Sequence, residues 1–151
     1  MTKGLLFDCD NTVANWAFDL FKLPKTKIDR ALGVVDQEGK IIGAFLFQSW
    51  NGFNVELSYY GQNALTPGII RCIAKFAVVA LNVTRLTVHT SKRNRKLMHV
   101  FHRLGFRLEG TQRVFYGRRD CARNTAVRFV MFRDRLEQLA LIPPQVEEKI
   151  C

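Results

Sequence analysis

The chain has 151 residues, of which 48% are hydrophobic and 24% are charged, and its formal net charge is +10. This length and balance are typical of one globular domain with a substantial core. No apolar run is long enough to span a bilayer and no secretory pattern opens the chain, so we expect one cytoplasmic domain over 1–151 without membrane association.

The first two predicted elements are a strand over 3–8 and a helix over 11–21. Their junction reads LLFDCDNTVA, which resembles the D-x-D-x-T motif of HAD phosphatases, with Asp8 as nucleophile and Asp10 as general acid. Such a pair can hold Mg²⁺ and attack a phosphate. No later acidic pair completes that metal site, so we favour helix capping as the role of both carboxylates.

Three antiparallel strands are expected next. Residues 28–36 and 40–48 form a hairpin around the turn 37–39, and a turn at 50–52 leads into a third strand over 53–61. Glu56 is the one carboxylate on that third strand.

A helix start follows the third strand. Thr66 is a favourable N-cap and Pro67 suits the first helical position, so a helix is predicted from there to Leu81. The free N–H groups of a first helical turn favour an anion, and Gly68 permits a close approach. This segment is therefore either a phosphate site or an ordinary capped helix.

The next unit is a strand over 85–90, which a right-handed helical crossover places parallel to the strand over 53–61. A helix then runs from 95 to 104, with Asn94 as N-cap and Gly105 as terminator. One apolar stripe marks its buried face: Leu97, Val100, Phe101 and Leu104.

The carboxy-terminal third is predicted to hold a strand from Phe106, a basic turn over 117–124, a last strand over 125–132 and a short helix over 133–142. We expect 143–151 to be a loose tail. Exposed apolar surface on the last strand would suit a homodimer.

The spacing from Asn94 to Phe101 and on to Gly105-Phe106, Glu109-Gly110 and Arg113 resembles the last conserved helix and strand of the GNAT N-acetyltransferases. The segments VELSYYG and QNALTPG are similar to the pyrophosphate-binding part of that family. The resemblance covers roughly 28–132 and is strongest to small phage-type members. It implies an α/β (α+β) fold, in which a mixed, mostly antiparallel sheet has splayed parallel central strands and flanking helices.

The resemblance also implies a function, namely transfer of acetyl from acetyl-CoA to an amine, with Glu56 as base. Phe101 stands where many relatives have a tyrosine as general acid, so Tyr59, Tyr60 or Tyr116 would have to replace it. Leu65 and Pro67 depart from the usual small residues of the loop. The implied coenzyme-binding residues are Leu57, Ser58, Tyr59, Gln62, Asn63, Ala64, Leu65, Thr66, Pro67, Gly68, Asn94, Lys96 and Phe101.

Charge is unevenly placed along the chain. Residues 85–135 hold 14 Lys and Arg against three acidic residues, a net of +11, and the remainder holds nine against ten. This basic half suits coenzyme phosphates and an acidic partner, most simply a host or cellular protein carrying the acceptor amine. Two alternatives stay open: a catalytically weak GNAT-fold protein that binds and modulates a partner protein, and a nucleic-acid-binding domain.

Metal binding and disulfides are not expected. Cys9, Cys72, Cys121 and Cys151 show no C-x-x-C spacing, so we expect four reduced thiols. His99 and His102 lie three residues apart on one helix, where a solvated polar face is the simpler interpretation than a metal pair.

Overall fold

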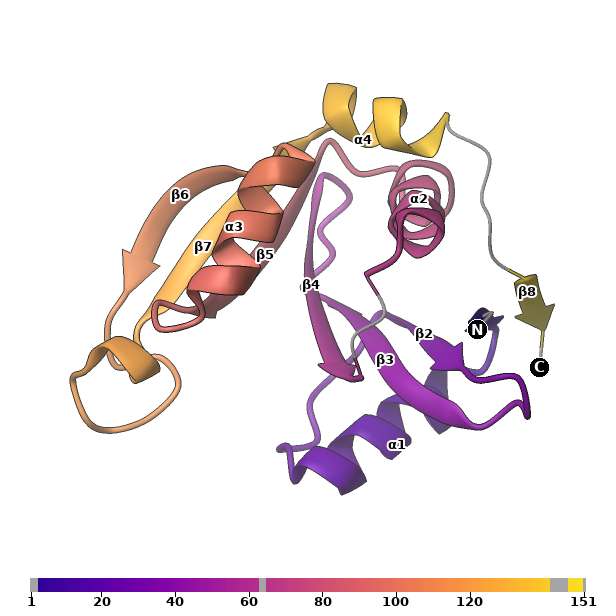
Figure 1. The fold of residues 1–151 in the computed structure, drawn as a ribbon, viewed down its shortest axis with the longest axis horizontal. Helices are drawn as coiled ribbons and strands as arrows, with labels where there is room; N and C mark the ends of the chain where they lie inside the picture. The colour runs from indigo at the N-terminus through magenta and orange to yellow at the C-terminus, as the bar shows by residue number, and fades with distance from the viewer. Residues whose placement is uncertain (1–2, 63–64, 142–146, 151) are drawn as a thin grey trace.

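The computed structural model describes residues 3–62, 65–141 and 147–150. These residues form one sheet with helices on both of its faces (Figure 1). The strands are β1 (Gly4–Phe7), β2 (Arg30–Val35), β3 (Ile41–Gln48), β4 (Asn54–Gly61), β5 (Arg85–Ser91), β6 (Arg107–Gln112), β7 (Ala126–Phe132) and β8 (Glu147–Ile150). The helices are α1 (Asp10–Phe21), α2 (Pro67–Lys75), the π-helical turn η1 (Phe76–Ala80), α3 (Arg95–Leu104), the 3-10 turn η2 (Ala122–Asn124) and α4 (Arg133–Ala140).

The sheet is mixed and mostly antiparallel. Its eight strands follow the order β6-β7-β5-β4-β3-β2-β1-β8, and only the pairs β4–β5 and β1–β8 are parallel. The predicted fold class is therefore confirmed, including the hairpin of β2 and β3 and the parallel partner of β4.

Two apolar clusters hold the layers together. The larger one joins α2, α4 and one face of the sheet through buried side chains such as Phe47, Met131 and Leu136. The smaller one lies under α1, where Val13 and Ala17 occupy one helical stripe and pack toward β2 and β3. α1 and α2 thus cover opposite faces of the sheet.

The two central parallel strands part in the middle of the molecule. Their register runs from Asn54 opposite Arg85 to Leu57 opposite Val88 and then stops. Beyond that point β4 still pairs with β3 as far as Gly61, and β5 still pairs with β7 as far as Ser91. In Figure 1 the two strands diverge from this vertex, with α2 and α3 on either side of the opening. The expected splay is confirmed.

Side-chain caps start both helices that border the opening. The backbone N–H of Ile69 donates to the Thr66 hydroxyl at 3.3 Å, and that of Leu97 donates to the Asn94 amide oxygen at 3.2 Å. Both caps had been predicted. The helix expected as far as Leu81 instead passes into η1, where the N–H of Leu81 donates to the Phe76 carbonyl at 3.2 Å.

The capping role predicted for Asp8 and Asp10 is wrong. Cys9 occupies the N-cap position of α1 and makes no side-chain cap bond. Asp10 accepts hydrogen bonds from the Arg30 side chain at 2.7 Å and from the Ala31 N–H at 3.1 Å, and Asp8 pairs with Arg30 at 3.3 Å. The two carboxylates of the motif thus bind the Arg30 guanidinium of β2. Across the described ranges, no three His, Cys, Asp or Glu side chains form a metal cluster.

Two expectations for the chain ends also need correction. Residues 147–150 form β8, which pairs with β1, so this part of the predicted tail belongs to the sheet. Cys9 is disulfide-bonded, whereas Cys121 is a free thiol. β8 pairs in parallel with β1, and β1 ends shortly before Cys9. Local sequence patterns do not predict this long-range contact. No helix within the described ranges is long and apolar enough to cross a bilayer.

Candidate functional site

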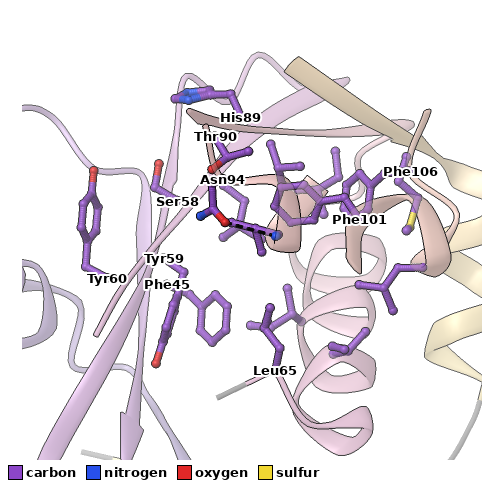
Figure 2. Close-up of a pocket in the computed structure, with 18 of the residues that line it drawn as sticks. Phe45, Ser58, Tyr59, Tyr60, Leu65, His89, Thr90, Asn94, Phe101 and Phe106 are labelled. Carbon is purple, nitrogen blue, oxygen red and sulfur yellow. Dashed lines mark hydrogen bonds between the residues drawn. The ribbon is translucent and has the colours of Figure 1, made fainter. Parts of the chain in front are cut away.

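A cavity of about 440 Å³ passes through the opening between β4 and β5 (Figure 2). It reaches from the face of the sheet that α2 and α3 cover to the opposite face, where it meets the loop between β6 and β7. Its lining comprises Phe45, Leu57, Ser58, Tyr59, Tyr60, Leu65, Ile70, Ile73, Ala74, Leu86, Val88, His89, Thr90, Ser91, Asn94, Leu97, Phe101, Leu104, Phe106, Tyr116, Arg123, Met131, Leu136 and Leu139.

The part of the cavity on the α2 and α3 side is apolar. Leu57 projects into it from β4, Leu65 from the segment before α2, and Leu97 from α3. Phe101 contributes a ring that packs against Phe106 and Phe129, with centroids 5.3 Å and 5.5 Å apart. This side can hold a slender chain with little polar character.

The part on the other face of the sheet is polar. Side chains alternate along a strand, so Ser58 and Tyr60 face this side while Tyr59 faces α2, as Figure 2 shows. The His89 Nδ1 lies 2.9 Å from the Tyr116 hydroxyl, and the Phe115 ring meets the His89 ring edge-on at 5.0 Å. An imidazole and three hydroxyl groups therefore surround this mouth.

The electrostatic surroundings keep His89 neutral. Partial burial lowers its pKa below the usual 6.5, and the charge of Arg128 lowers it further, while Glu56 acts in the opposite direction. Glu56 itself lies 3.6 Å from the Arg128 guanidinium. Burial also raises the pKa of Tyr116 to about 12, so that this phenol stays protonated. The mouth thus contains an uncharged base beside a proton donor.

Tyr59 ties β4 to the segment that precedes α2. Its ring packs on Phe45 with centroids 4.5 Å apart, and its hydroxyl donates a short hydrogen bond to the Gln62 carbonyl. Burial raises the pKa of Tyr59 to about 12. Its hydroxyl is thus engaged in holding the loop and does not face the polar mouth.

The structure brings together part of the predicted site. Six of the predicted residues line the cavity, namely Leu57, Ser58, Tyr59, Leu65, Asn94 and Phe101. Gln62 and Thr66 precede α2, Pro67 and Gly68 are its first two residues, and Lys96 is exposed in the first turn of α3. Glu56 lies outside the lining and pairs with Arg128 of β7. Asn63 and Ala64 lie outside the described residues.

Sequence reasoning missed His89 and Arg123. His89 had a visible signal, since it is the one ionisable residue within the strand segment LTVHT and shares the strand face of Arg85. Arg123 had none, because only the folding back of the loop over 113–125 brings it to the cavity. Ser91 holds that loop by donating from its hydroxyl to the Arg123 carbonyl at 2.7 Å.

Three features of the site fit a molecule such as coenzyme A. The N-terminus of α2 carries free N–H groups that favour phosphate, and the cavity offers an apolar slot. Beyond Leu57 and Val88, β4 and β5 no longer pair with each other, so the edge of each strand that faces the slot has no strand partner there. An extended chain with amide groups can bond to such an edge.

Comparison by sequence finds no matching protein-family model and no matching curated protein. Comparison by structure finds spermidine N-acetyltransferases. The enzyme SpeG from Vibrio cholerae in complex with manganese ions is 16% identical with a TM-score of 0.63, and the alignment covers 72% of this chain and 68% of that one. The dodecameric structure of the Vibrio cholerae enzyme in an intermediate state is 18% identical with a TM-score of 0.60, covering 70% and 66%.

These similarities define the fold of the chain as that of the GNAT N-acetyltransferases. At these identities the likeness concerns the fold. The aligned part spans about two thirds of the neighbours' own length.

Proposed function

We propose that the protein is an N-acetyltransferase that moves an acetyl group from acetyl-CoA to an amine. The observation that carries this proposal is a single cavity that crosses the splayed sheet, apolar on one side and lined by His89, Ser58, Tyr60 and Tyr116 on the other. A thioester entering from the α2 side and an amine entering from the other face would meet at the vertex between Leu57 and Val88.

The coenzyme would occupy the side of α2 and α3. The segment from Gln62 to Gly68 and the first turn of α2 would bind the pyrophosphate, and Lys96 would add a positive charge at the start of α3. The pantetheine arm would lie in the slot and bond to the open edge of β4 between Leu57 and Tyr59. Asn94, which caps α3 and lines the cavity, has remaining amide hydrogen-bonding capacity for the arm.

The transfer step needs a base and an acid. The amine nitrogen attacks the thioester carbonyl carbon, so that a C–N bond forms and the C–S bond breaks to release the coenzyme thiolate. We assign the amine proton to Nε2 of His89, in the tautomer whose Nδ1–H donates to the Tyr116 oxygen. The Tyr116 hydroxyl then supplies a proton to the thiolate, a role that Phe101 cannot fill. The Nδ1–H of the His89 imidazolium replaces the proton that Tyr116 has lost, which returns both side chains to their neutral forms.

Glu56 acts behind this pair in the proposal. We had expected it to be the base, yet it lies outside the cavity lining and beside Arg128. Its negative charge raises the pKa of His89 and so stabilises the imidazolium that forms during transfer. Glu56 is therefore proposed as a positioning and charge-stabilising residue.

The acceptor is proposed to be an amine on an acidic molecule, most simply a protein. The structural neighbours are named for spermidine, which is a polycation. Here Arg123 lines the cavity mouth, and Arg118 and Arg119 extend from the same loop, so a polycation would meet repulsion. A cytoplasmic location and a homodimer stay predictions.

Calorimetry on the purified chain tests the coenzyme site. We expect acetyl-CoA and CoA to bind with micromolar affinity and ATP to bind much more weakly. Thr66→Trp should abolish binding because the indole would cover the start of α2, whereas Thr111→Trp on the exposed β6 should bind as the unmodified chain does. Equal affinity in the two variants would contradict the placement.

A transfer assay distinguishes an active acetyltransferase from a catalytically weak GNAT-fold protein. Thiol release with acetyl-CoA and an acidic lysine peptide is the result expected of an enzyme. Binding of coenzyme without release, over a panel of amines, would favour the catalytically weak GNAT-fold protein that modulates a partner, for which Phe101 is the supporting observation. A nucleic-acid-binding domain would instead bind DNA or RNA without any coenzyme.

A further inference from the structure

We propose that the acceptor carries a carboxylate near its amine, and that the Arg123 guanidinium binds this carboxylate while the amine lies at His89. This inference rests on the proposed function, since it concerns the acceptor end of the same cavity. It narrows the acceptor to two sources of that chemistry, a free amino acid or a lysine beside an acidic residue in a peptide. Arg123 is then a residue that determines specificity.

The charges that line the cavity favour an anion over an ammonium ion. Arg123 is the one permanently charged residue of the lining, and within the described part of the chain no Asp or Glu side chain lines the cavity. The pKa of His89 is lowered from 6.5, so this imidazole is uncharged near neutral pH. A molecule with both an amine and a carboxylate would therefore be held by its carboxylate.

The Arg123 guanidinium is available to a ligand. Arg123 is exposed, and its side chain forms no hydrogen bond or ion pair with another described residue. Other arginines near the mouth are occupied, since Arg113 pairs with Asp120 and Arg128 pairs with Glu56. Arg123 thus keeps all five of its N–H donors, and a guanidinium has no acceptor role to play there.

The backbone that carries Arg123 is fixed beside the proposed base. The Ser91 hydroxyl donates to the Arg123 carbonyl at 2.7 Å, which joins this loop to β5. The Tyr116 N–H donates to the Asn124 carbonyl at 3.1 Å, and the Tyr116 hydroxyl contacts the imidazole of His89. Arg123 is therefore linked to His89 through the strand on one side and through Tyr116 on the other.

The spacing suits an acceptor in which both groups are close together. Ser91 and His89 are two residues apart on β5, so they share one strand face and are separated by about 7 Å. An arginine side chain that starts beside Ser91 is long enough to cover this step. A guanidinium is a planar fork that can bind a carboxylate through two parallel hydrogen bonds, and the two single charges balance.

The same cation would favour the reactive form of the amine. A positive charge lowers the pKa of a neighbouring ammonium group, so the acceptor amine would lose its proton to solvent more readily. The neutral amine is the form that attacks the thioester, and its remaining proton passes to His89 as in the proposed function. Arg123 would thus bind the acceptor and promote its deprotonation.

Transfer kinetics with two matched acceptor pairs test the proposal. The first pair is leucine and leucinamide, and the second is a blocked glutamyl-lysine peptide and its glutaminyl-lysine counterpart, so that each pair differs in one carboxylate. We expect kcat/KM to be about 10- to 100-fold higher for the glutamyl peptide than for the glutaminyl peptide, or an equal gain for leucine once the different amine pKa of leucinamide is allowed for. The pair that responds identifies the source of the carboxylate.

Substitution of Arg123 assigns the preference to this residue. Arg123→Gln should remove the ratio within the responding pair, and Arg123→Lys should restore part of it. The change on substitution is independent of the amine pKa, because each acceptor is compared with itself. Arg107→Gln, on the exposed strand β6, removes the same charge outside the cavity lining and should keep the ratio.

The outcomes distinguish the two proposals. Equal transfer to both members of each pair, or a ratio that Arg123→Gln leaves unchanged, overturns the carboxylate site and leaves the proposed function standing. If CoA does not bind to the folded chain and no acceptor releases thiol, the proposed function fails and this inference falls with it. Where turnover is slow, calorimetry of the same pairs on the CoA-saturated chain measures the ratio.

Discussion

At the scale of single residues, the proposed chemistry depends on one uncharged imidazole. His89 lies on β5 at the polar mouth, and its bond to the Tyr116 hydroxyl orients the ring. Burial and Arg128 favour its neutral form, which is the form able to accept a proton from an amine. The carboxylate of Glu56 offsets part of this effect and keeps the pKa of His89 within reach of the reaction.

The dependence of activity on pH should report this residue. Protonation of His89 removes the base, and its pKa is lowered from 6.5, so kcat/KM should fall on the acid side only below pH 6.5. In His89→Gln we expect a rate lower by about 100-fold, without that acid limb. Steady-state kinetics between pH 5 and 9 measure both. An unchanged acid limb in His89→Gln would assign the limb to another group.

The stability of the fold should also decrease at acid pH, for the same reason. Because the folded state disfavours protonation of His89, the unfolded chain takes up this proton more readily, and the free energy of unfolding should decrease as the pH falls below 6.5. His89→Gln lacks this contribution and serves as the reference in urea titrations.

The residue scale is also where the sequence predicted least. The position of Glu56 on its strand suggested a catalytic base. Its ion-pair partner Arg128 comes from β7, however, and its charge raises the pKa of His89 on β5. Asp8 and Asp10 were predicted to cap a helix, but in the structure both form ion pairs with Arg30 of β2. Each of these roles depends on a partner from a distant segment, which local spacing does not specify.

At the scale of elements, the site is made by two capped helices on either side of a splayed strand pair. The caps at Thr66 and Asn94 and the parallel pairing of β4 with β5 were predictable because they depend on local chemistry and on crossover handedness. The π-helical turn η1 and the strand β8 were not, since both are stabilised by contacts with remote segments. The loop over 113–125 is likewise held in place by hydrogen bonds to β5, such as the one from Ser91.

The cap of α3 is a separable contribution to stability. Asn94→Ala removes the acceptor for the Leu97 N–H and should lower the free energy of unfolding by about 1 kcal/mol. Asn94→Asp keeps an acceptor at the same place, next to the positive end of the helix, and should match or exceed the unmodified chain. Urea denaturation compares the three proteins. Equal losses in both variants would mean that the amide has another, more important partner.

At the scale of the whole molecule, charge divides the fold into two halves. The strands β5, β6 and β7 with α3 form the basic half, which lies on one side of the opening in Figure 1, and the remainder is close to neutral. Most of the net charge of +10 is thus carried beside the polar mouth and the apolar slot of the cavity. Such a field speeds the encounter with an acidic molecule and is screened by salt.

Reversing the charge of Arg118 and Arg119, in the loop over 113–125, should affect the amine substrate rather than the coenzyme. In Arg118→Glu with Arg119→Glu we expect kcat/KM for an acidic lysine peptide to fall by about tenfold, with a weaker dependence on salt. Acetyl-CoA affinity should change little because, in the proposed arrangement, the coenzyme would lie on the other face. Reversal of Lys25 and Lys27, in the segment between α1 and β2, is the control. An equal loss with a neutral amine would point to a structural defect in the loop.

The bare edges of β4 and β5 link the proposed coenzyme to the lifetime of the protein. A bound arm would act as the missing partner between two strands, so the empty form would lack hydrogen bonds that the occupied form possesses. A protein that opens more often is cut more often by proteases. In a cell with little acyl-CoA, the chain would then be degraded faster, and its abundance would follow the supply of its own substrate.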